Sequence, residues 1–111
     1  DIEFIDPFHQ IKGLEKFILF FKKTFDNFNY YNFKVLDNAS SSSAGYIKWQ
    51  FSFKNKKGLK EIIDGVSEIK FSNNGLVISH IDYWDTGNQI YLKVPLLNIV
   101  IKYIKRKIKL V

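Results

Sequence analysis

The stretch "IIDGVSEIKFSNNGLVISHIDYWD", residues 62–85, has the pattern of a β-hairpin. β-Branched and aromatic side chains dominate both arms, and the segment "SNNG" between them offers Asn and Gly residues that tolerate the positive φ angles of a tight turn. In the second arm, strand alternation sends His80, Asp82 and Trp84 to one face of the sheet. An imidazole, a carboxylate and an indole on one strand face indicate a polar site on an otherwise apolar surface.

Outward from this hairpin, hydrophobic periodicity divides the chain into further strands and two helices. Amphipathic helices carry apolar residues at three- and four-residue steps, whereas half-buried strands alternate. The residues between the first strand and the first helix, 6–13, are expected to form a turn. The expected elements are a short strand at 2–6, a helix of residues 14–28 that begins near Gly13, strands at 30–39, 45–55, 60–71 and 76–85, and a closing helix at 94–110.

This order of elements predicts an α+β fold. The sheet is expected to be curved and mostly antiparallel, in the form of a cone or half-barrel, with the long helix packed across it. An amphipathic C-terminal helix follows the sheet. A chain of 111 residues, 46% of them hydrophobic, is long enough for one core that buries roughly two thirds of the unfolded surface. We therefore expect residues 1–111 to form a single domain.

Aromatic side chains recur on the faces that would meet inside this cone. The apolar face of the first helix is expected to contain Phe21, and strand alternation places Trp49 on the same face as Phe51. Trp49 and Trp84 are expected to wall a cavity, although Trp49 fits a plain core position equally well if its strand shifts by one residue. The full helix face is Leu14, Phe17, Ile18, Phe21, Phe25 and Phe28.

Composition restricts the functional classes. The chain has no cysteine, which excludes disulfides and thiolate metal sites and fits a reducing compartment. Two histidines with scattered carboxylates make no metal motif, so we expect neither a metal nor another cofactor.

The positive charge is unevenly distributed. The net charge of +6 is concentrated in residues 102–109, and a chain whose only arginine is Arg106 lacks the basic stripe of a nucleic-acid module. No apolar run approaches the ~20 residues of a transmembrane helix. We expect a soluble, cytoplasmic protein that does not bind nucleic acid.

Three segments together resemble a known superfamily: "FIDPFHQIKGLEKFILFF", residues 4–21, "YIKWQFSF", residues 46–53, and the hairpin at 62–85. They resemble the nuclear-transport-factor-two-like superfamily, whose cone-shaped fold is shared by ketosteroid isomerase, limonene epoxide hydrolase and the polyketide cyclases. The similarity is greatest to SnoaL-like bacterial proteins that end in a "DYWD" strand and an "LP" helix. It covers nearly the whole chain and implies a fold more than a reaction, because this scaffold hosts unrelated activities. Members usually begin with one or two helices, which we expect to be lacking here.

The resemblance to ketosteroid isomerase implies a role for Asp6. Asp6 precedes Pro7 as the general-base aspartate of that enzyme precedes a proline, and Ser67 in "GVSEIKF" corresponds to the protonated aspartate of its oxyanion hole. The tyrosine of that oxyanion hole would lie on the lacking helix, so the isomerase machinery is incomplete. The plainer alternative is that an aspartate before a proline serves as a turn residue or cap.

The resemblance to limonene epoxide hydrolase implies a role for Asp82, which matches an aspartate of an Asp-Arg-Asp group. The partner positions fall at residues 46–49, which offer neither arginine nor carboxylate. His80 lies on the same strand face, about 7 Å along the strand, a gap that a ligand or water can bridge. An Asp-His pair can act as general base and acid near neutral pH, whereas a hydrogen-bonded lining histidine is the plainer alternative.

The closing helix has two interpretations. One side forms an apolar stripe, and lysines and an arginine surround it. Such a helix packs on its own sheet or across a dimer, which we favour, or it binds an acidic membrane surface or an acidic partner. The stripe is Leu97, Val100, Ile101, Ile104 and Ile108.

Two functional hypotheses follow. The first is a protein that binds a small hydrophobic molecule between Trp49 and Trp84; if it is an enzyme, it transfers a proton as an isomerase, cyclase or lyase. The second is a non-catalytic homodimeric interaction module. The polar contacts in the first are Asp6, His80 and Asp82, and the sheet face in the second is Phe51, Ile81 and Tyr83.

Overall fold

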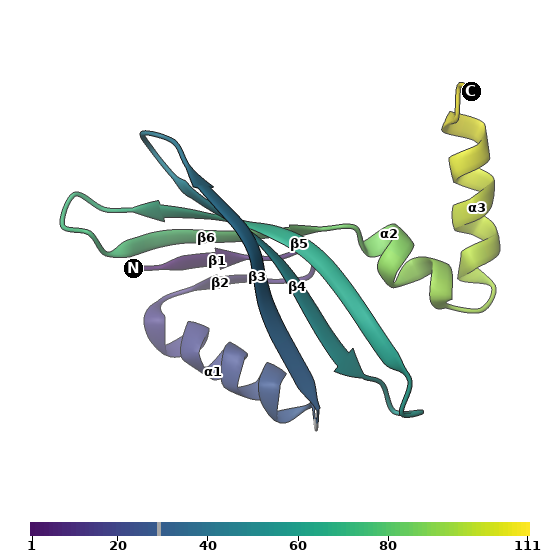
Figure 1. The fold of residues 1–111 in the computed structure, drawn as a ribbon, viewed down its shortest axis with the longest axis horizontal. Coiled ribbons are helices and arrows are strands. Elements are labelled where there is room, and N and C mark those ends of the chain that lie inside the picture. Colours follow the sequence, from purple (N-terminus) through teal and green to yellow (C-terminus); the bar gives the residue numbers. More distant parts are fainter. Residues whose placement is uncertain (29) are drawn as a thin grey trace.

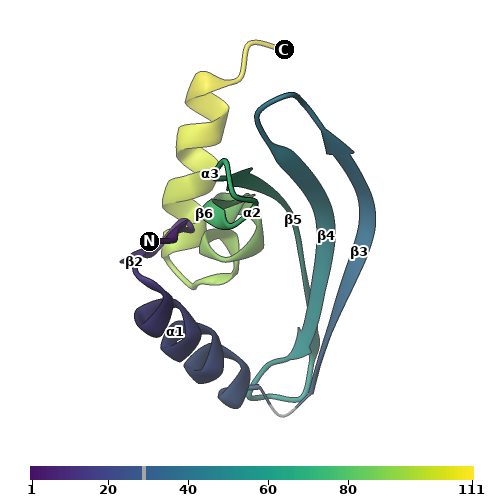
Figure 2. The ribbon, with the colours of Figure 1, turned by 90° about the vertical axis from the view of Figure 1, so that its left-hand side faces the viewer.

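A computed structural model describes residues 1–28 and 30–111, and in it one curved sheet carries a helix on its concave side (Figures 1 and 2). The predicted α+β fold is confirmed. The strands are β1 (Glu3–Ile5), β2 (Gln10–Lys12), β3 (Tyr31–Ser40), β4 (Gly45–Lys54), β5 (Lys60–Phe71) and β6 (Val77–Trp84). The helices are α1 (Leu14–Asp26), α2 (Thr86–Gln89) and α3 (Leu97–Ile108), with a 3₁₀ turn η1 (Tyr91–Lys93) between the last two.

The sheet has the strand order β2-β1-β6-β5-β4-β3. Strands β3 to β6 form an antiparallel meander, and β1 joins its edge by pairing parallel with β6 and antiparallel with β2. The hairpins after β4 and β5 turn at Gly58 and Gly75, whose positive φ angles of 77° and 82° suit a residue without a Cβ atom. The hairpin predicted from residues 62–85 is therefore present.

Three short elements were not predicted. Residues 6–13 contain β2, and the amide of Asp6 donates to the carbonyl of His9 at 3.0 Å to close the turn between β1 and β2. The four-residue α2 and the turn η1 precede α3, which begins at Leu97 and not at residue 94. Segments of three or four residues are too short to show a periodic hydrophobic pattern.

Helix α1 begins after Gly13, as expected, and lies beside the concave side of the sheet (Figure 2). Its phenylalanine rings contact aromatic rings of the sheet strands. The expected face was partly wrong, because Leu14 and Ile18 are exposed and Phe20 contacts the core instead. Phe4 of β1 is buried at the centre of this contact. Its ring centroid lies between 5.1 and 5.7 Å from those of Phe17, Phe20, Phe21 and His80.

The three residues of the dimer surface predicted from the sequence do not lie on one face of the sheet. Phe51 lies on the concave face, where its ring centroid is 5.4 Å from that of Phe28. Ile81 and Tyr83 have the opposite parity to His80 and Asp82 and belong to the convex face. The expectation that Phe51 shares a surface with Ile81 and Tyr83 is therefore wrong.

Helix α3 stands beyond the end of the sheet and packs mainly against η1 (Figure 1). The expectation that it packs on its own sheet is wrong, since its main contact is with η1 and none of its residues is buried. Packing across a dimer stays a prediction. The molecule exposes 8661 Å², compared with about 6,400 Å² for a compact monomer of this mass. Within residues 1–28 and 30–111, no helix combines the length and apolar character that crossing a membrane requires.

Candidate functional site

A cavity of about 360 Å³ lies between α1 and the concave face of the sheet. Its size falls in the range of small-molecule sites, roughly 300 to 1,000 Å³, and aromatic side chains supply most of its wall. All the site residues predicted from the sequence border it: Asp6 from the β1–β2 turn, Phe21 from α1, Trp49 from β4, Ser67 from β5, and His80, Asp82 and Trp84 from β6.

The strand register explains why these side chains meet. Trp49 of β4 lies opposite Gly65 of β5, which in turn lies opposite Trp84 of β6. The indole of Trp49 lies across Gly65, because a Cβ atom at that position would come within 2.4 Å of the Cζ2 atom of Trp49. Two residues further along β5, Ser67 lies opposite Asp82. Paired residues share a sheet face, so all of these positions face the cavity.

A chain of hydrogen bonds joins three strands across this face. Trp49 Nε1 donates to Ser67 Oγ at 2.8 Å, and Ser67 Oγ donates to Asp82 Oδ1 at 2.5 Å. His80 Nε2 lies 2.8 Å from the same Oδ1 atom. Trp49 and Ser67 are only 6% and 5% exposed, so their polar atoms depend on these partners. Because the indole nitrogen can only donate, the hydroxyl proton of Ser67 is left to point at the carboxylate.

The contact between His80 and Asp82 is closer than the sequence suggested. Their backbones are spaced as expected for same-face neighbours on one strand, but the two side chains lean together and bond directly. The link from Ser67 to Asp82 was missed entirely. Strand alternation relates a residue only to other residues of its own strand. The register between β5 and β6 is needed to show that Ser67 and Asp82 share a face of the sheet.

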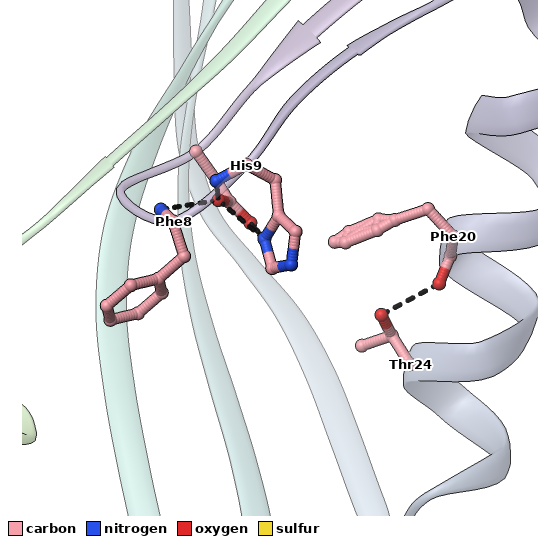
Figure 3. Close-up of polar contacts among 5 residues, drawn as sticks. Phe8, His9, Phe20 and Thr24 are labelled. Carbon is pink, nitrogen blue, oxygen red and sulfur yellow. Dashed lines mark hydrogen bonds and ion pairs between the residues drawn. The ribbon is translucent and has the colours of Figure 1, made fainter.

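Asp6 lies at the β1–β2 turn and is bound by its own neighbours along the chain. Its Oδ1 atom accepts from the backbone amides of Phe8 and His9 at 2.8 and 2.6 Å, and His9 Nδ1 lies 3.0 Å away. Figure 3 shows the imidazole of His9 between this turn and Phe20 of α1, with ring centroids 4.6 Å apart. The turn role considered for Asp6 is thus present, and its role as a base stays a prediction.

The carboxylates of Asp6 and Asp82 are both largely withdrawn from solvent, with side chains 13% and 18% exposed. The hydrogen bonds that the described residues make to Asp82 both go to Oδ1, on the side of Ser67 and His80. The second oxygen, Oδ2, therefore has capacity to accept a donor. In residues 1–28 and 30–111, no three His, Asp or Glu side chains are grouped to hold a metal ion.

Comparison with known proteins gives matches of structure alone. No family model and no curated protein matches the chain. An NTF2-like protein of unknown function from Burkholderia pseudomallei superposes with a TM-score of 0.70 at 15% identity, over 81% of this chain and 74% of that one. The chain has the NTF2-like fold. The resemblance found in the sequence is therefore confirmed at the level of fold.

Two other similar structures are linked to small molecules, one by its name and one by the compound crystallised with it. A candidate SnoaL-like polyketide cyclase from Shewanella putrefaciens gives a TM-score of 0.65 at 20% identity, over 84% of this chain and 70% of that one. TerC, co-crystallised with polyporic acid, gives 0.67 at 13% identity, over 78% and 72%. At these identities the NTF2-like fold is shared, and an activity is not implied.

Proposed function

We propose that this protein binds a small hydrophobic molecule in the cavity under α1 and that Asp82 accepts a hydrogen bond or a proton from it. The observation that carries the proposal is the hydrogen-bond chain from Trp49 through Ser67 to Asp82, set in a wall of aromatic rings. Apolar pockets with a few converging polar groups are typical of sites for small molecules.

The geometry suits a fixed proton acceptor. Ser67 and His80 hold Oδ1 of Asp82 from two sides, so the carboxylate does not need to reorient when a donor approaches Oδ2. The surrounding rings leave the Asp82 side chain only 18% exposed, and a low-dielectric environment strengthens the interaction between a carboxylate and a donor. His80, hydrogen-bonded to the same carboxylate, is a second group that can accept or donate a proton.

If the protein is an enzyme, proton transfer is the reaction class that these residues support. Asp82 would take a proton from carbon or oxygen of the ligand, as an isomerase, cyclase or lyase requires, and His80 would assist. Two neighbours of the same fold agree with a small-molecule role, since one is named for polyketide cyclisation and another was crystallised with polyporic acid. Asp6, in the turn that follows β1 beside β6, is proposed as a second acceptor in the cavity.

Titration calorimetry with two matched probes tests the proposal. 2-Naphthol carries a hydroxyl donor, and 2-methoxynaphthalene has the same rings without the donor. We expect both to bind, and 2-naphthol to bind about tenfold more tightly, since a hydrogen bond to a charged acceptor contributes about 1.5 kcal/mol or more. Failure of both probes to bind would contradict the cavity as a ligand site, and equal affinities would contradict the role of Asp82.

A second candidate function is that of a homodimeric module, favoured by the convex face of the sheet. Val66 and Tyr83 lie opposite each other there, and both are exposed. They adjoin a polar pair in which the Tyr46 hydroxyl donates to Glu68 at 3.2 Å, and this bond with the nearby charge raises the pKa of Tyr46. Apolar side chains with a polar rim are typical of interfaces between subunits.

Light scattering decides between a monomer and this dimer. We expect the wild type to be dimeric and Tyr83→Lys to be monomeric, because a buried unpaired charge at the centre of the face opposes association. Lys34→Gln on the exposed edge strand β3 is the control and should remain dimeric. A monomeric wild type would exclude this candidate.

A further inference from the structure

Helix α3 carries an exposed apolar stripe along one side. Ile104 and Ile108 are 44% and 71% exposed, and Leu97 and Val100 continue the stripe toward the start of the helix. In a helix with 3.6 residues per turn these four positions fall on one side. Leu96, in the turn just before the helix, is exposed as well and extends the apolar edge. The stripe is about 18 Å long for a helix of 12 residues.

Positive charge borders this stripe on both sides. Helical spacing places Lys105 on one flank and Lys107 on the other, with the remaining cations further round the helix. No acidic residue occurs between Leu97 and Val111. Lys105 donates to Asn88 of α2 and so ties the helix to the body, while the other four cations are exposed. The cations of α3 are Lys102, Lys105, Arg106, Lys107 and Lys109.

We propose that α3 binds the surface of a lipid bilayer that contains anionic lipids. The helix lies in the plane of the interface, with Leu97, Ile104 and Ile108 among the acyl chains. A strongly amphipathic helix of low mean hydropathy, with lysines around its apolar face, is the pattern of helices that lie on membranes. Lysines on both flanks reach the headgroup layer because their apolar stems extend along the helix while the amines stay in water.

Charge complementarity favours an anionic lipid surface over two other occupants. Two copies of α3 packed stripe to stripe would bring their cations together with no acid to pair them. A nucleic-acid backbone would pair with the cations but would leave the isoleucines facing water, because phosphate contacts bury no apolar stripe. An anionic bilayer pairs with the cations of α3 through its headgroups and buries the apolar stripe among its acyl chains.

Co-sedimentation with vesicles tests the charge requirement. The probe is phosphatidylcholine vesicles with about 30% phosphatidylserine, and pure phosphatidylcholine vesicles are the reference. We expect sedimentation with the anionic vesicles, weakened by high salt, and little with the reference. The triple variant Lys102→Gln, Lys107→Gln, Lys109→Gln should bind about 100-fold more weakly, since each charge contributes about fivefold.

A matched control variant separates α3 from net charge. Lys56→Gln, Lys57→Gln, Lys60→Gln removes the same charge from the exposed end of the β4–β5 hairpin. It should bind the anionic vesicles as the wild type does. Equal losses in the two triple variants would overturn the proposal, because the attraction would then belong to the whole surface.

A second pair of variants tests the apolar stripe. Ile104→Ser, Ile108→Ser should lower binding about tenfold or more, because methylene groups no longer enter the bilayer. Ile99→Ser is the control: Ile99 is 63% exposed but lies on the opposite side of the helix, so binding should not change. Circular dichroism and thermal unfolding should match the wild type in both variants, as these side chains have little contact with the body.

Three further results would overturn the proposal. The first is the absence of sedimentation with anionic vesicles at physiological salt. The second is equal binding to pure phosphatidylcholine. The third is a solution dimer that the Ile104→Ser, Ile108→Ser variant dissociates and that vesicles do not compete with, which would assign the stripe to a second copy of the chain.

Discussion

Asp6 and Asp82 border the same cavity, each beside an imidazole, yet different parts of the fold hold them. Asp6 is bound by backbone amides two and three residues along its own turn and by the adjacent His9. Asp82 is bound by Ser67 on the neighbouring strand and His80 on its own, and through Ser67 by Trp49 one strand further.

The different hydrogen-bond partners determine what each carboxylate can do. The turn at Asp6 needs its carboxylate for local structure, as an aspartate that caps free amides does in many turns. The carboxylate of Asp82 satisfies no backbone amide among the described residues, and its partners hold it in an aromatic cavity. Asp6 is held by its own turn, and Asp82 is held by tertiary contacts. Only the carboxylate of Asp82 has no part in stabilising the backbone next to it.

The largest effect is expected when Trp49, at the far end of the hydrogen-bond chain to Asp82, is truncated. Trp49→Ala deletes a buried indole that packs over Gly65 and donates to Ser67, and it should lower the free energy of unfolding by about 3 kcal/mol. Chemical denaturation of the variant and the wild type measures this. Trp84→Ala, at a half-buried position of the same cavity, is the control and should cost less. A loss under about 1 kcal/mol for Trp49→Ala would contradict its place in the core.

A smaller effect is expected when the same series of hydrogen bonds is disturbed but all of its polar groups are kept. Gly65→Ala places a Cβ atom 2.4 Å from the Trp49 ring, so the indole must shift. We expect a loss of about 2 kcal/mol and a changed chemical shift for the indole proton that binds Ser67. Gly87→Ala, where the nearest atom to the new Cβ is a side-chain oxygen at 3.3 Å, is the milder comparison. An unshifted indole signal in Gly65→Ala would contradict the contact.

Truncating each carboxylate compares the two sites directly. Asp82→Ala leaves Ser67 and His80 without their acceptor in a partly buried site, which should cost about 2 kcal/mol. Asp6→Ala removes a cap from exposed turn amides and should cost about 1 kcal/mol. Thermal unfolding of the two variants measures the order. The reverse order would contradict the distinction between a tertiary and a local acceptor.

The smallest effect concerns Asp85, a third carboxylate that is bound locally. The backbone amide of Asn88 donates to it at 3.0 Å and, with the Asn88 side chain and Lys105, holds the pKa of Asp85 below its ordinary 3.8. A lowered folded-state pKa stabilises the fold above pH 3.8, and this stability is lost as the pH falls through the lower value. Asp85 is exposed, so we expect only about 0.5 kcal/mol.

The variant Asp85→Asn checks this dependence, since asparagine can still cap α2 but cannot titrate. Its unfolding temperature should fall less steeply below pH 3.8 than that of the wild type. Identical slopes would show that Asp85 has no lowered pKa in the folded state.

The long elements of the fold could be predicted because each repeats its pattern several times. Helix α1 and strands β4 to β6 span eight or more residues, enough for periodicity to appear. Strand β2 and helix α2 have three and four residues and give no such signal. The exposure of α3 could not be predicted either, because an amphipathic pattern identifies an apolar side and does not say what covers it.

The cavity could be predicted in part. Alternation along β6 correctly grouped His80, Asp82 and Trp84, since parity within one strand needs no partner. The bond from Ser67 to Asp82 depends on an irregularity in the β5–β6 hairpin. Phe71 pairs with Val77, and a regular hairpin would continue from there to pair Ser67 with Ile81, but the register shift after Lys70 pairs it with Asp82.

The central claim is that Asp82 is the main acceptor for a ligand in the cavity and that Asp6 is secondary. Calorimetry with 2-naphthol and 2-methoxynaphthalene on Asp82→Asn and Asp6→Asn tests it most directly. An asparagine at position 82 would point an amide donor where Oδ2 now accepts, so the preference for 2-naphthol should disappear in that variant and persist in Asp6→Asn. A preference that survives in Asp82→Asn and disappears in Asp6→Asn would contradict the account.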